Sequence, residues 1–393
     1  MAEAGASGPD DTGSDEHRVT PLELFFDLAF VFGFTQVTSL VVDDPTWGGV
    51  FRGMLVLAAL WWAWVGYAWF TSTLDVDEGG VRLAMLAAMG AMLFVALAVP
   101  GAFGDDALLF GISYFAVRAL HLVLYAIVSR DDPDLRGALL RIVPSELLGA
   151  SLLVLAGFLE GDARIAAWLV ALAVDYLGPA VMNLRGWRIA PDHFAERHGL
   201  VILIALGESI IAIGVGVGAG LELVPEVLFA GALGIVVVSA LWWLYFDVAA
   251  IFQRTGLVGT SGVERARMAR DSYSYLHLPM VAGIVLFAFG LETTLHHVED
   301  PLPIVPAVAL CGGAALYLLG QVASLFRAIR HLFRRRLIGA LVLLALIPVA
   351  REVPALAALA GVSAVCAGVV AYEAIRHREH RIQVRHPELS GEG

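Results

Sequence analysis

Acidic side chains lie inside long apolar runs of this sequence, where they could bind protons or cations. Glu208 lies in the run from residue 196 to 218, nine residues after Gly199. At the helical rise this is about 14 Å into a bilayer core about 30 Å thick. A carboxylate there costs about 2.5 kcal/mol or more, so it is a functional-site hypothesis. The alternatives are that Glu208 pairs with an arginine that locks the bundle, or that it stays protonated.

A second acidic pair lies in the first apolar run. Glu23 and Asp27 are four residues apart and therefore share one helix face. Their charges repel, so either one is protonated, or a cation or an arginine lies between them. Glu23 is near the cytoplasmic edge, where water is a simpler explanation. Asp27 is about 9 Å inside and harder to explain by solvation.

The predicted span from Leu108 to Val128 carries a positive charge. Arg118 and His121 are three residues apart, on one face, and Arg118 is about 15 Å from the outer edge. A buried arginine requires a partner. The candidates are Glu208, Asp175 near the midplane, and Glu146, which is about 6 Å from the cytoplasmic edge.

Acids outnumber fixed positive charges in this count of the spans. The predicted spans contain four acids, Asp27, Glu146, Asp175 and Glu208, and one arginine, Arg118. His121 and His277 can titrate. Protons, bound cations or local water must relieve this excess, which favours a proton or cation pathway. The alternative is a set of separate buried hydrogen bonds that form no pathway.

Other polar residues carry weaker signals. Ser209 can form a hydrogen bond between helices. Glu196 and Arg197 lie at the cytoplasmic start of the span from Gly199, where charge is ordinarily solvated, and His277 is also explained as a core histidine.

Sequence motifs for metal binding and catalysis are not apparent. The loop from His296 to Asp300 has metal-ligand residue types, but its spacing fits no structural zinc pattern, so a solvated loop is favoured and no metal site is expected. Cys311 and Cys366 both fall in apolar runs, which argues against a disulfide framework. We find no nucleotide loop, nucleophile elbow or zincin motif, and expect neither a cofactor nor enzymatic activity.

The elements that position these residues are membrane spans. The chain has 393 residues, 59% of them hydrophobic, with a mean hydropathy of +0.78, and no soluble fold has so many apolar runs of about 20 residues. We predict an all-α, polytopic membrane bundle of about twelve helices. The expected spans are residues 21–41, 48–70, 81–99, 108–128, 142–159, 163–184, 199–218, 224–246, 272–291, 303–326, 337–349 and 354–374.

Arginine placement predicts the orientation. All 25 basic residues are arginine; 21 fall on the side of the termini, three (Arg52, Arg164 and Arg351) fall on the other side, and Arg118 lies within a span. The positive-inside rule therefore places both termini in the cytoplasm of a bacterium, with the chain in its inner membrane. Residues 1–18 are predicted to be a disordered acidic tail, and 378–393 a polar one. The net charge of −12 argues against nucleic-acid binding.

Short matches between distant spans predict an internal repeat. The motif Ala-Leu-Trp-Trp occurs at 59–62 and 240–243, and Gly90 to Phe94 is echoed by Gly283 to Phe287. The halves, 19–190 and 191–377, would be parallel six-helix units related by an axis along the membrane normal. Chance similarity among apolar helices is the alternative.

Two segments resemble the bacterial low-temperature-requirement protein A family. They are Pro21-Leu-Glu-Leu-Phe-Phe-Asp-Leu-Ala-Phe-Val and His193-Phe-Ala-Glu-Arg-His-Gly-Leu, which continues to Ala205-Leu-Gly-Glu-Ser209. The family pattern has Phe where this chain has His198. The resemblance implies a multi-pass membrane protein and leaves its activity open. The first span is also weakly similar to that of the endolysosomal potassium channels, but Phe26-Asp27 lacks the intervening Ser of their signature.

These observations favour transport or conduction of a small cation or polar solute, with proton coupling as an option. Asp27 and Glu208 are the predicted solute or proton sites, with Arg118 as their counter-ion; Glu146, Asp175 and His121 are further members. The alternative is a non-transporting sensor or accessory protein in low-temperature stress, with structural buried charges. The predicted partners are the lipid bilayer and a proton, cation or small polar solute; the sequence leaves a homo-oligomer open.

Overall fold

The computed structural model describes residues 19–73, 79–218 and 224–376 of a helical bundle. Both predicted tails, 1–18 and 378–393, lie outside these residues. The long helices are α1 (Pro21–Asp43), α2 (Trp47–Thr71), α3 (Gly79–Leu97), α4 (Ala107–Val128), α5 (Pro133–Ala156), α6 (Gly161–Val181), α7 (Pro191–Gly218), α8 (Pro225–Leu244), α11 (Leu278–His296), α12 (Ile304–Ile329), α13 (Arg334–Ala350) and α14 (Ala355–Arg376). The described residues form no β-strand, so the all-α class is confirmed.

Eleven helices of the described chain are long and apolar enough to cross a membrane. The remaining predicted span, α13, is a helix of 17 residues that begins with three consecutive arginines. It is about 26 Å long, slightly less than the hydrocarbon core of a typical bilayer. The polytopic bundle is therefore confirmed.

Two helices extend beyond the predicted spans. The predicted spans end at Phe246 and resume at Ser272, whereas α8 continues through a π-helical turn, η2 (Tyr245–Ala249), into α9 (Ala250–Val258). A second helix, α10 (Gly262–Met268), enters α11 through the π-helix η3 (Ala269–Tyr275). The prediction missed these segments because they carry charge, yet they still bury one face against the bundle, including Gln253 and Leu257.

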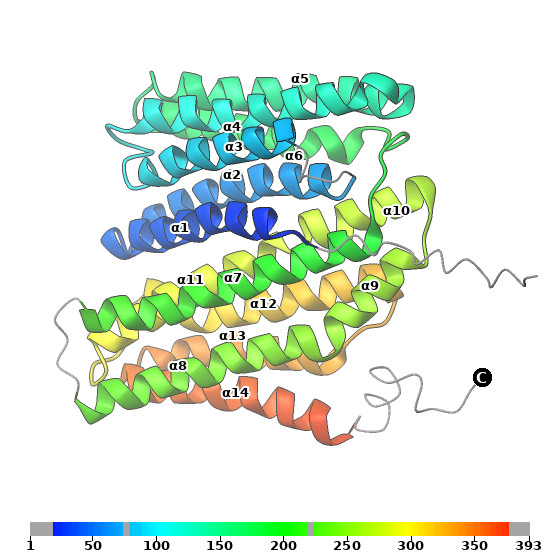
Figure 1. The fold of residues 1–393 in the computed structure, drawn as a ribbon. Helices are drawn as coiled ribbons and strands as arrows, with labels where there is room; N and C mark the ends of the chain where they lie inside the picture. Colours follow the sequence, from blue (N-terminus) through cyan, green and yellow to red (C-terminus); the bar gives the residue numbers. More distant parts are fainter. Residues whose placement is uncertain (1–18, 74–78, 219–223, 377–393) are drawn as a thin grey trace, which may run out of the picture.

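Helices α1–α6 lie on one side of the bundle and α7–α14 on the other (Figure 1). In the first half, α1 packs on α2 and α3, and α3 to α6 then pack in series. In the second half, α7 packs on α8 and α11, and α11 to α14 pack in series. Two copies of one six-helix unit would have this order of neighbours; the repeat itself stays a prediction.

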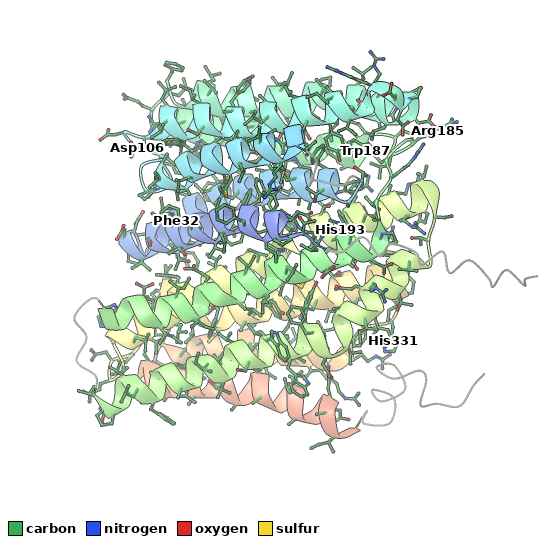
Figure 2. All side chains as sticks on the ribbon, in the orientation of Figure 1. Phe32, Asp106, Arg185, Trp187, His193 and His331 are labelled. Atoms are coloured by element: carbon green, nitrogen blue, oxygen red, sulfur yellow. The ribbon has the colours of Figure 1, made fainter. Side chains whose placement is uncertain are left out.

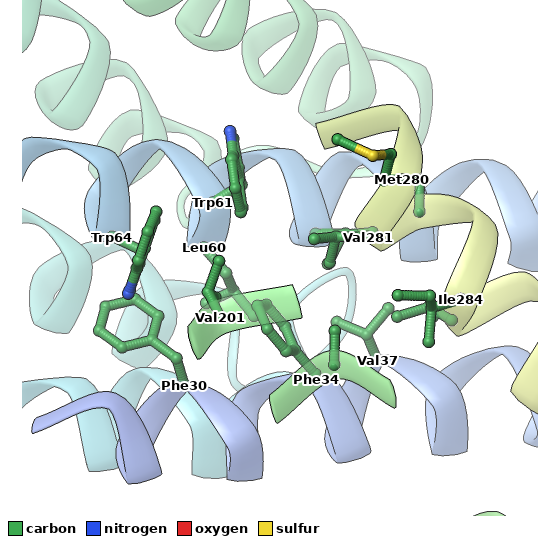
Figure 3. Close-up of a cluster of buried hydrophobic side chains, with 14 of the residues drawn as sticks. Phe30, Phe34, Val37, Leu60, Trp61, Trp64, Val201, Met280, Val281 and Ile284 are labelled. Atoms are coloured by element: carbon green, nitrogen blue, oxygen red, sulfur yellow. The ribbon is translucent and has the colours of Figure 1, made fainter. Parts of the chain in front are cut away.

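The halves meet through an apolar contact between α1 and α2 on one side and α7 and α11 on the other (Figure 3). Its buried side chains are Phe30, Phe34, Val37, Leu60, Trp61, Trp64, Val201, Met280, Val281 and Ile284. Because the contact is formed by large hydrophobic groups, it is closely packed between the halves. A charged side chain beside this apolar contact therefore needs a defined position in the bundle.

Glycines permit a close helix crossing between α11 and α12. A Cβ atom added at Gly313 would lie 2.5 Å from the backbone nitrogen of Phe287 and 2.6 Å from the carbonyl oxygen of Gly283. A Cβ at Gly290 would lie 2.5 Å from the backbone nitrogen of Leu310. Small residues at such contacts let two backbones approach, the main source of packing between helices in a membrane.

We predict that Gly313→Ala destabilises the protein by about 1–3 kcal/mol, because backbone atoms must move to admit the methyl group. Gly312→Ala is a matched control, since its Cβ would meet only Val308 Cγ1 at 3.7 Å. It should be neutral, or stabilising by up to about 1 kcal/mol through helix propensity. Thermal unfolding of detergent-purified protein compares them, and equal melting temperatures would contradict the close crossing.

Candidate functional site

Glu23 is fixed at the start of α1 by a capping interaction. Thr20 caps the helix. The Thr20 hydroxyl accepts a hydrogen bond from the backbone N–H of Glu23 at 3.3 Å, and the backbone N–H of Thr20 donates to Glu23 Oε2 at 2.9 Å. This reciprocal arrangement satisfies two N–H groups that the helix leaves open. Glu23 is 1% exposed, so the alternative that it is simply solvated is wrong.

Arg197 of α7 bridges the two acids of α1. Its Nη1 atom is 2.7 Å from Glu23 Oε1, and its Nη2 atom is 2.7 Å from Asp27 Oδ1. His193 Nε2 lies 3.1 Å from the other Glu23 oxygen. We call Glu23, Asp27, His193 and Arg197 the α1–α7 network; Figure 2 labels His193, which lies between the two halves. Of the alternatives for the acidic pair, an arginine between the carboxylates is correct.

Matched spacing on two helices creates this network. Glu23 and Asp27 are four residues apart on α1, and His193 and Arg197 are four apart on α7, so each pair projects from one face. The prediction that charge here is ordinarily solvated is wrong for Arg197, which is fully buried, and right for Glu196, which is exposed. The physical reason is that α7 begins at Pro191, eight residues before the predicted span.

Neighbours on α2 add two hydrogen bonds to this network. Trp64 Nε1 donates to Asp27 Oδ1 at 3.0 Å, and Arg197 Nη1 donates to Thr71 Oγ1 at 3.1 Å. Charge-assisted bonds of this kind offset the desolvation of a buried ion pair. One guanidinium therefore holds two carboxylates, while Asp27 Oδ2 and Arg197 Nε have no hydrogen-bond partner among the described residues.

A second charged group, the Arg118 cluster, joins three helices of the first half. Arg118 Nη2 is 3.2 Å from Glu146 Oε1 and 3.9 Å from Asp175 Oδ1, and His121 Nδ1 is 3.3 Å from Glu146 Oε2. All four side chains are buried. Sequence reasoning named these residues, and the structure brings them together.

Glycines make room for the Arg118 cluster. A Cβ added at Gly149 would lie 2.4 Å from Asp175 Oδ1, and one at Gly66 would lie 3.0 Å from His121 Cε1. The Arg118 guanidinium also donates from Nη1 to the carbonyl oxygen of Trp62 at 3.1 Å. Helix α2 thus supplies both space and a hydrogen-bond acceptor.

A cavity of about 50 Å³ adjoins the Arg118 cluster. Arg118, His121 and Glu146 line it together with the aromatic side chains of Trp62, Trp69, Tyr125 and Trp187. Trp187, one of these lining residues, lies toward the end of the bundle where α7 begins (Figure 2). This volume holds about three to five water molecules. Arg270 of η3 also lines it, so both halves contribute to its wall.

Glu208 occupies a separate position on α7. It is 1% exposed, and its Oε2 atom accepts a hydrogen bond of 2.6 Å from the Thr35 hydroxyl of α1. The prediction that Arg118 is the counter-ion of Glu208 and Asp27 is wrong, because Arg118 pairs within the first half and Arg197 pairs with Asp27. Equal depth in the membrane does not imply contact, since helices far apart in a bundle reach the same depth.

Comparisons with known proteins identify the family. Residues 18–371 match the family described as Bacterial low temperature requirement A protein (LtrA). The chain belongs to this family. An uncharacterized protein of Rhizobium meliloti (strain 1021) is 32% identical over 385 residues, which cover 93% of this chain and 91% of the relative. No solved structure matches the chain.

The remaining predicted residues of this LtrA-family protein lie elsewhere. His277 is buried and bonded on both ring nitrogens, to Tyr245 Oη at 2.8 Å and to the Ser272 carbonyl oxygen at 2.9 Å, as a core histidine would be. Ser209 is fully buried beside Glu208, and its hydroxyl has no hydrogen-bond partner among the described residues. In the described ranges no three His, Cys, Asp or Glu residues are grouped as a metal site.

Sequence reasoning missed several residues of the LtrA-family site. It did not place His193 or Arg197 in the network, nor Tyr125 and Trp187 at the cavity. For Arg197 a signal was available: a proline at the first helical position marks Pro191 as a helix start, which puts Arg197 inside α7. For Tyr125 and Trp187 there was none, because aromatic residues in apolar runs are usually core.

We predict that Arg197→Met destabilises the protein by about 3–5 kcal/mol, because it leaves two buried carboxylates without their counter-ion. Combining Arg197→Met with Glu23→Gln and Asp27→Asn should restore part of the lost stability. Chemical or thermal unfolding in detergent gives the comparison.

Arg254→Met is the matched control for that measurement. Arg254 pairs with Asp192 at 2.5 Å, but both side chains are at least half exposed, so the expected cost is about 0–1 kcal/mol. If Arg197→Met and Arg254→Met cost the same, or neutralising both acids restores nothing, the α1–α7 network does not carry the stability assigned to it.

Proposed function

We propose that this LtrA-family membrane protein transports or conducts a small cation or polar solute, with proton exchange at buried acids. The solute or proton sites in this proposal are the Arg118 cluster with its cavity, and Glu208. The α1–α7 network, including Asp27, holds the halves together. No catalytic step is assigned to any residue.

The cavity beside the Arg118 cluster carries the proposal. It lies beside a buried arginine, histidine and glutamate within helices that are long and apolar enough to span a membrane. Ionisable groups at membrane depth are costly, and where they face a water-sized space they characteristically mark solute or proton paths. Glu146 was predicted as a secondary member; its position at this cavity makes it a primary one.

The charge balance of the described residues also supports proton or cation exchange. The buried acids are Glu23, Asp27, Glu146, Asp175, Glu208, Asp247 and Glu292, whereas the buried arginines are Arg118, Arg197 and Arg336. The sequence count therefore missed two arginines, but acids still exceed fixed positive charges. Neutral forms or bound cations relieve such an excess.

The proposed setting is the bacterial inner membrane with cytoplasmic termini. The 21-to-3 arginine distribution supports this orientation. In this orientation Trp187, which lines the cavity, lies toward the cytoplasm. Lipid is the surrounding partner, and neither a nucleic acid nor a cofactor is part of the proposal.

A non-transporting sensor or accessory protein is the second candidate. The α1–α7 network favours it, because Glu23 and Asp27 are held by Arg197 and do not line the cavity. The predicted acids therefore do not converge on one space. Under this alternative the buried charges only join helices, and no solute crosses.

Flux into proteoliposomes distinguishes the two candidates. We expect wild-type protein to increase the passage of potassium ions, protons or small polar solutes over protein-free vesicles. Glu146→Gln and Glu208→Gln should each reduce that flux about tenfold or more, since each removes a charge-assisted interaction.

Glu226→Gln is the matched control, because Glu226 is exposed at the start of α8. It should leave the flux unchanged. Wild-type vesicles that are no more permeable than protein-free ones would favour the accessory function, and normal flux in Glu208→Gln would remove Glu208 from the mechanism.

A further inference from the structure

The connection between α12 and α13 carries the densest run of arginines in the chain. Five arginines and one histidine fall within residues 327–336, and no aspartate or glutamate occurs from residue 301 to 351. Figure 2 labels His331 at the same end of the bundle as Arg185, opposite Asp106. In the proposed orientation this end is cytoplasmic, so the connection lies at the level of the lipid headgroups of that leaflet.

Two of these arginines pair with acids of neighbouring helices. Arg336 is buried, and its Nε and Nη2 atoms lie 3.0 and 2.9 Å from the two carboxylate oxygens of Glu373 on α14. Its Nη1 atom donates to Gln321 Oε1 at 2.9 Å. Arg327 Nε lies 3.0 Å from Asp271 Oδ2. These pairs hold both ends of the connection against the bundle, so the segment between them has a defined position.

The other three arginines of the connection, Arg330, Arg334 and Arg335, are exposed. Arg330 and Arg334 have no carboxylate within ion-pair distance in the part of the chain that the structure describes. The guanidinium carbon of Arg335 lies 4.2 Å from the ring centroid of Tyr372, and that of Arg330 lies 5.9 Å from the ring centroid of Phe326. Arginines beside aromatic rings at the ends of apolar helices are typical of a membrane–water interface.

The start of α13 is an unfavourable place for cations. Its first turn holds Arg334, Arg335 and Arg336 and no acidic residue, and its N-cap Phe333 makes no side-chain cap hydrogen bond. A helix N-terminus has a partial positive charge, which repels arginines and attracts anions. Glu373 pairs with Arg336, but no acid among the described residues pairs with Arg334. An anion bound at this terminus would offset the remaining repulsion.

An anionic lipid fits this surface better than a soluble anion does. Ile338 and Leu341 lie four and seven residues after Arg334, so the three side chains share one helix face. Ile338 and Leu341 are 58% and 55% exposed, and Leu332 in the connection is 42% exposed. In the proposed membrane, acyl chains cover this apolar stripe, and a lipid there carries its phosphate to Arg334. A soluble anion gains nothing from the stripe.

We propose that Arg330, Arg334 and Arg335 bind the headgroup of an anionic phospholipid in the cytoplasmic leaflet. The guanidinium groups donate hydrogen bonds to the phosphate oxygens, for which the planar fork of arginine is suited. The acyl chains lie against Ile338 and Leu341. The site is separate from the groups assigned to transport, so binding can be tested without measuring flux.

Fluorescence anisotropy of a labelled phosphatidylglycerol, titrated with the detergent-purified full chain, tests the proposal. Unlabelled phosphatidylglycerol, phosphatidylcholine and potassium phosphate are the competitors. Arg330→Gln combined with Arg334→Gln removes two charges that no described acid neutralises. Arg254→Gln combined with Arg267→Gln is the matched control, because it removes the same charge from exposed arginines that pair with acids. Circular dichroism checks that all variants are folded.

We expect Arg330→Gln with Arg334→Gln to bind phosphatidylglycerol about five- to thirtyfold more weakly, since each arginine contributes to headgroup attraction. The control pair should change binding by about twofold or less. Arg330→Lys with Arg334→Lys keeps both charges and should retain most of the binding.

Phosphatidylcholine and potassium phosphate should compete weakly. Equal competition by phosphatidylcholine, displacement by phosphate at the same concentration, or equal losses in the two glutamine pairs would overturn the inference. Absence of phosphatidylglycerol binding would also overturn it, and would point to an acidic protein as the partner of this surface.

Discussion

The structure depends on the salt bridges by which Arg197 joins the first helix of each half. One guanidinium lies 2.7 Å from carboxylate oxygens of both Glu23 and Asp27, in a fully buried position. Charges in an apolar interior persist only when they are paired and hydrogen-bonded. The pairing fixes the register of α1 against α7, because four-residue spacings on the two helices must coincide. The apolar contact of Phe30, Phe34 and Val201 then packs along the same interface.

The Arg118 cluster follows the same constraint but has a different consequence. Arg118 is also held by carboxylates from neighbouring helices, yet its cluster borders a space that the α1–α7 network lacks. Glycines on α2 and α5 leave room there, and aromatic residues shape the walls. One buried arginine therefore joins the two halves, whereas the other joins helices of the first half beside a cavity. This division is the physical basis for assigning structure to the first group and solute contact to the second.

Glu208 differs from both groups. Its described hydrogen bond comes from a neutral hydroxyl, that of Thr35, across the contact between α1 and α7. It therefore lacks the strong pairing that accounts for Asp27. Glu208 is therefore a buried acid with no arginine within ion-pair distance among the described residues.

The sequence by itself determined the helical membrane class of this protein and its family. Apolar runs of about 20 residues predicted the helices, and family motifs around Asp27 and Glu208 predicted the family, since both are local properties of the chain. It also named Glu146 and Asp175 among the candidate ion-pair partners of Arg118. Only the tertiary structure decided that Arg118 pairs with Glu146 rather than Glu208, and that Arg197 is buried. Helical spacing gives the face and depth of a side chain, but which helices are neighbours depends on how all of them pack together.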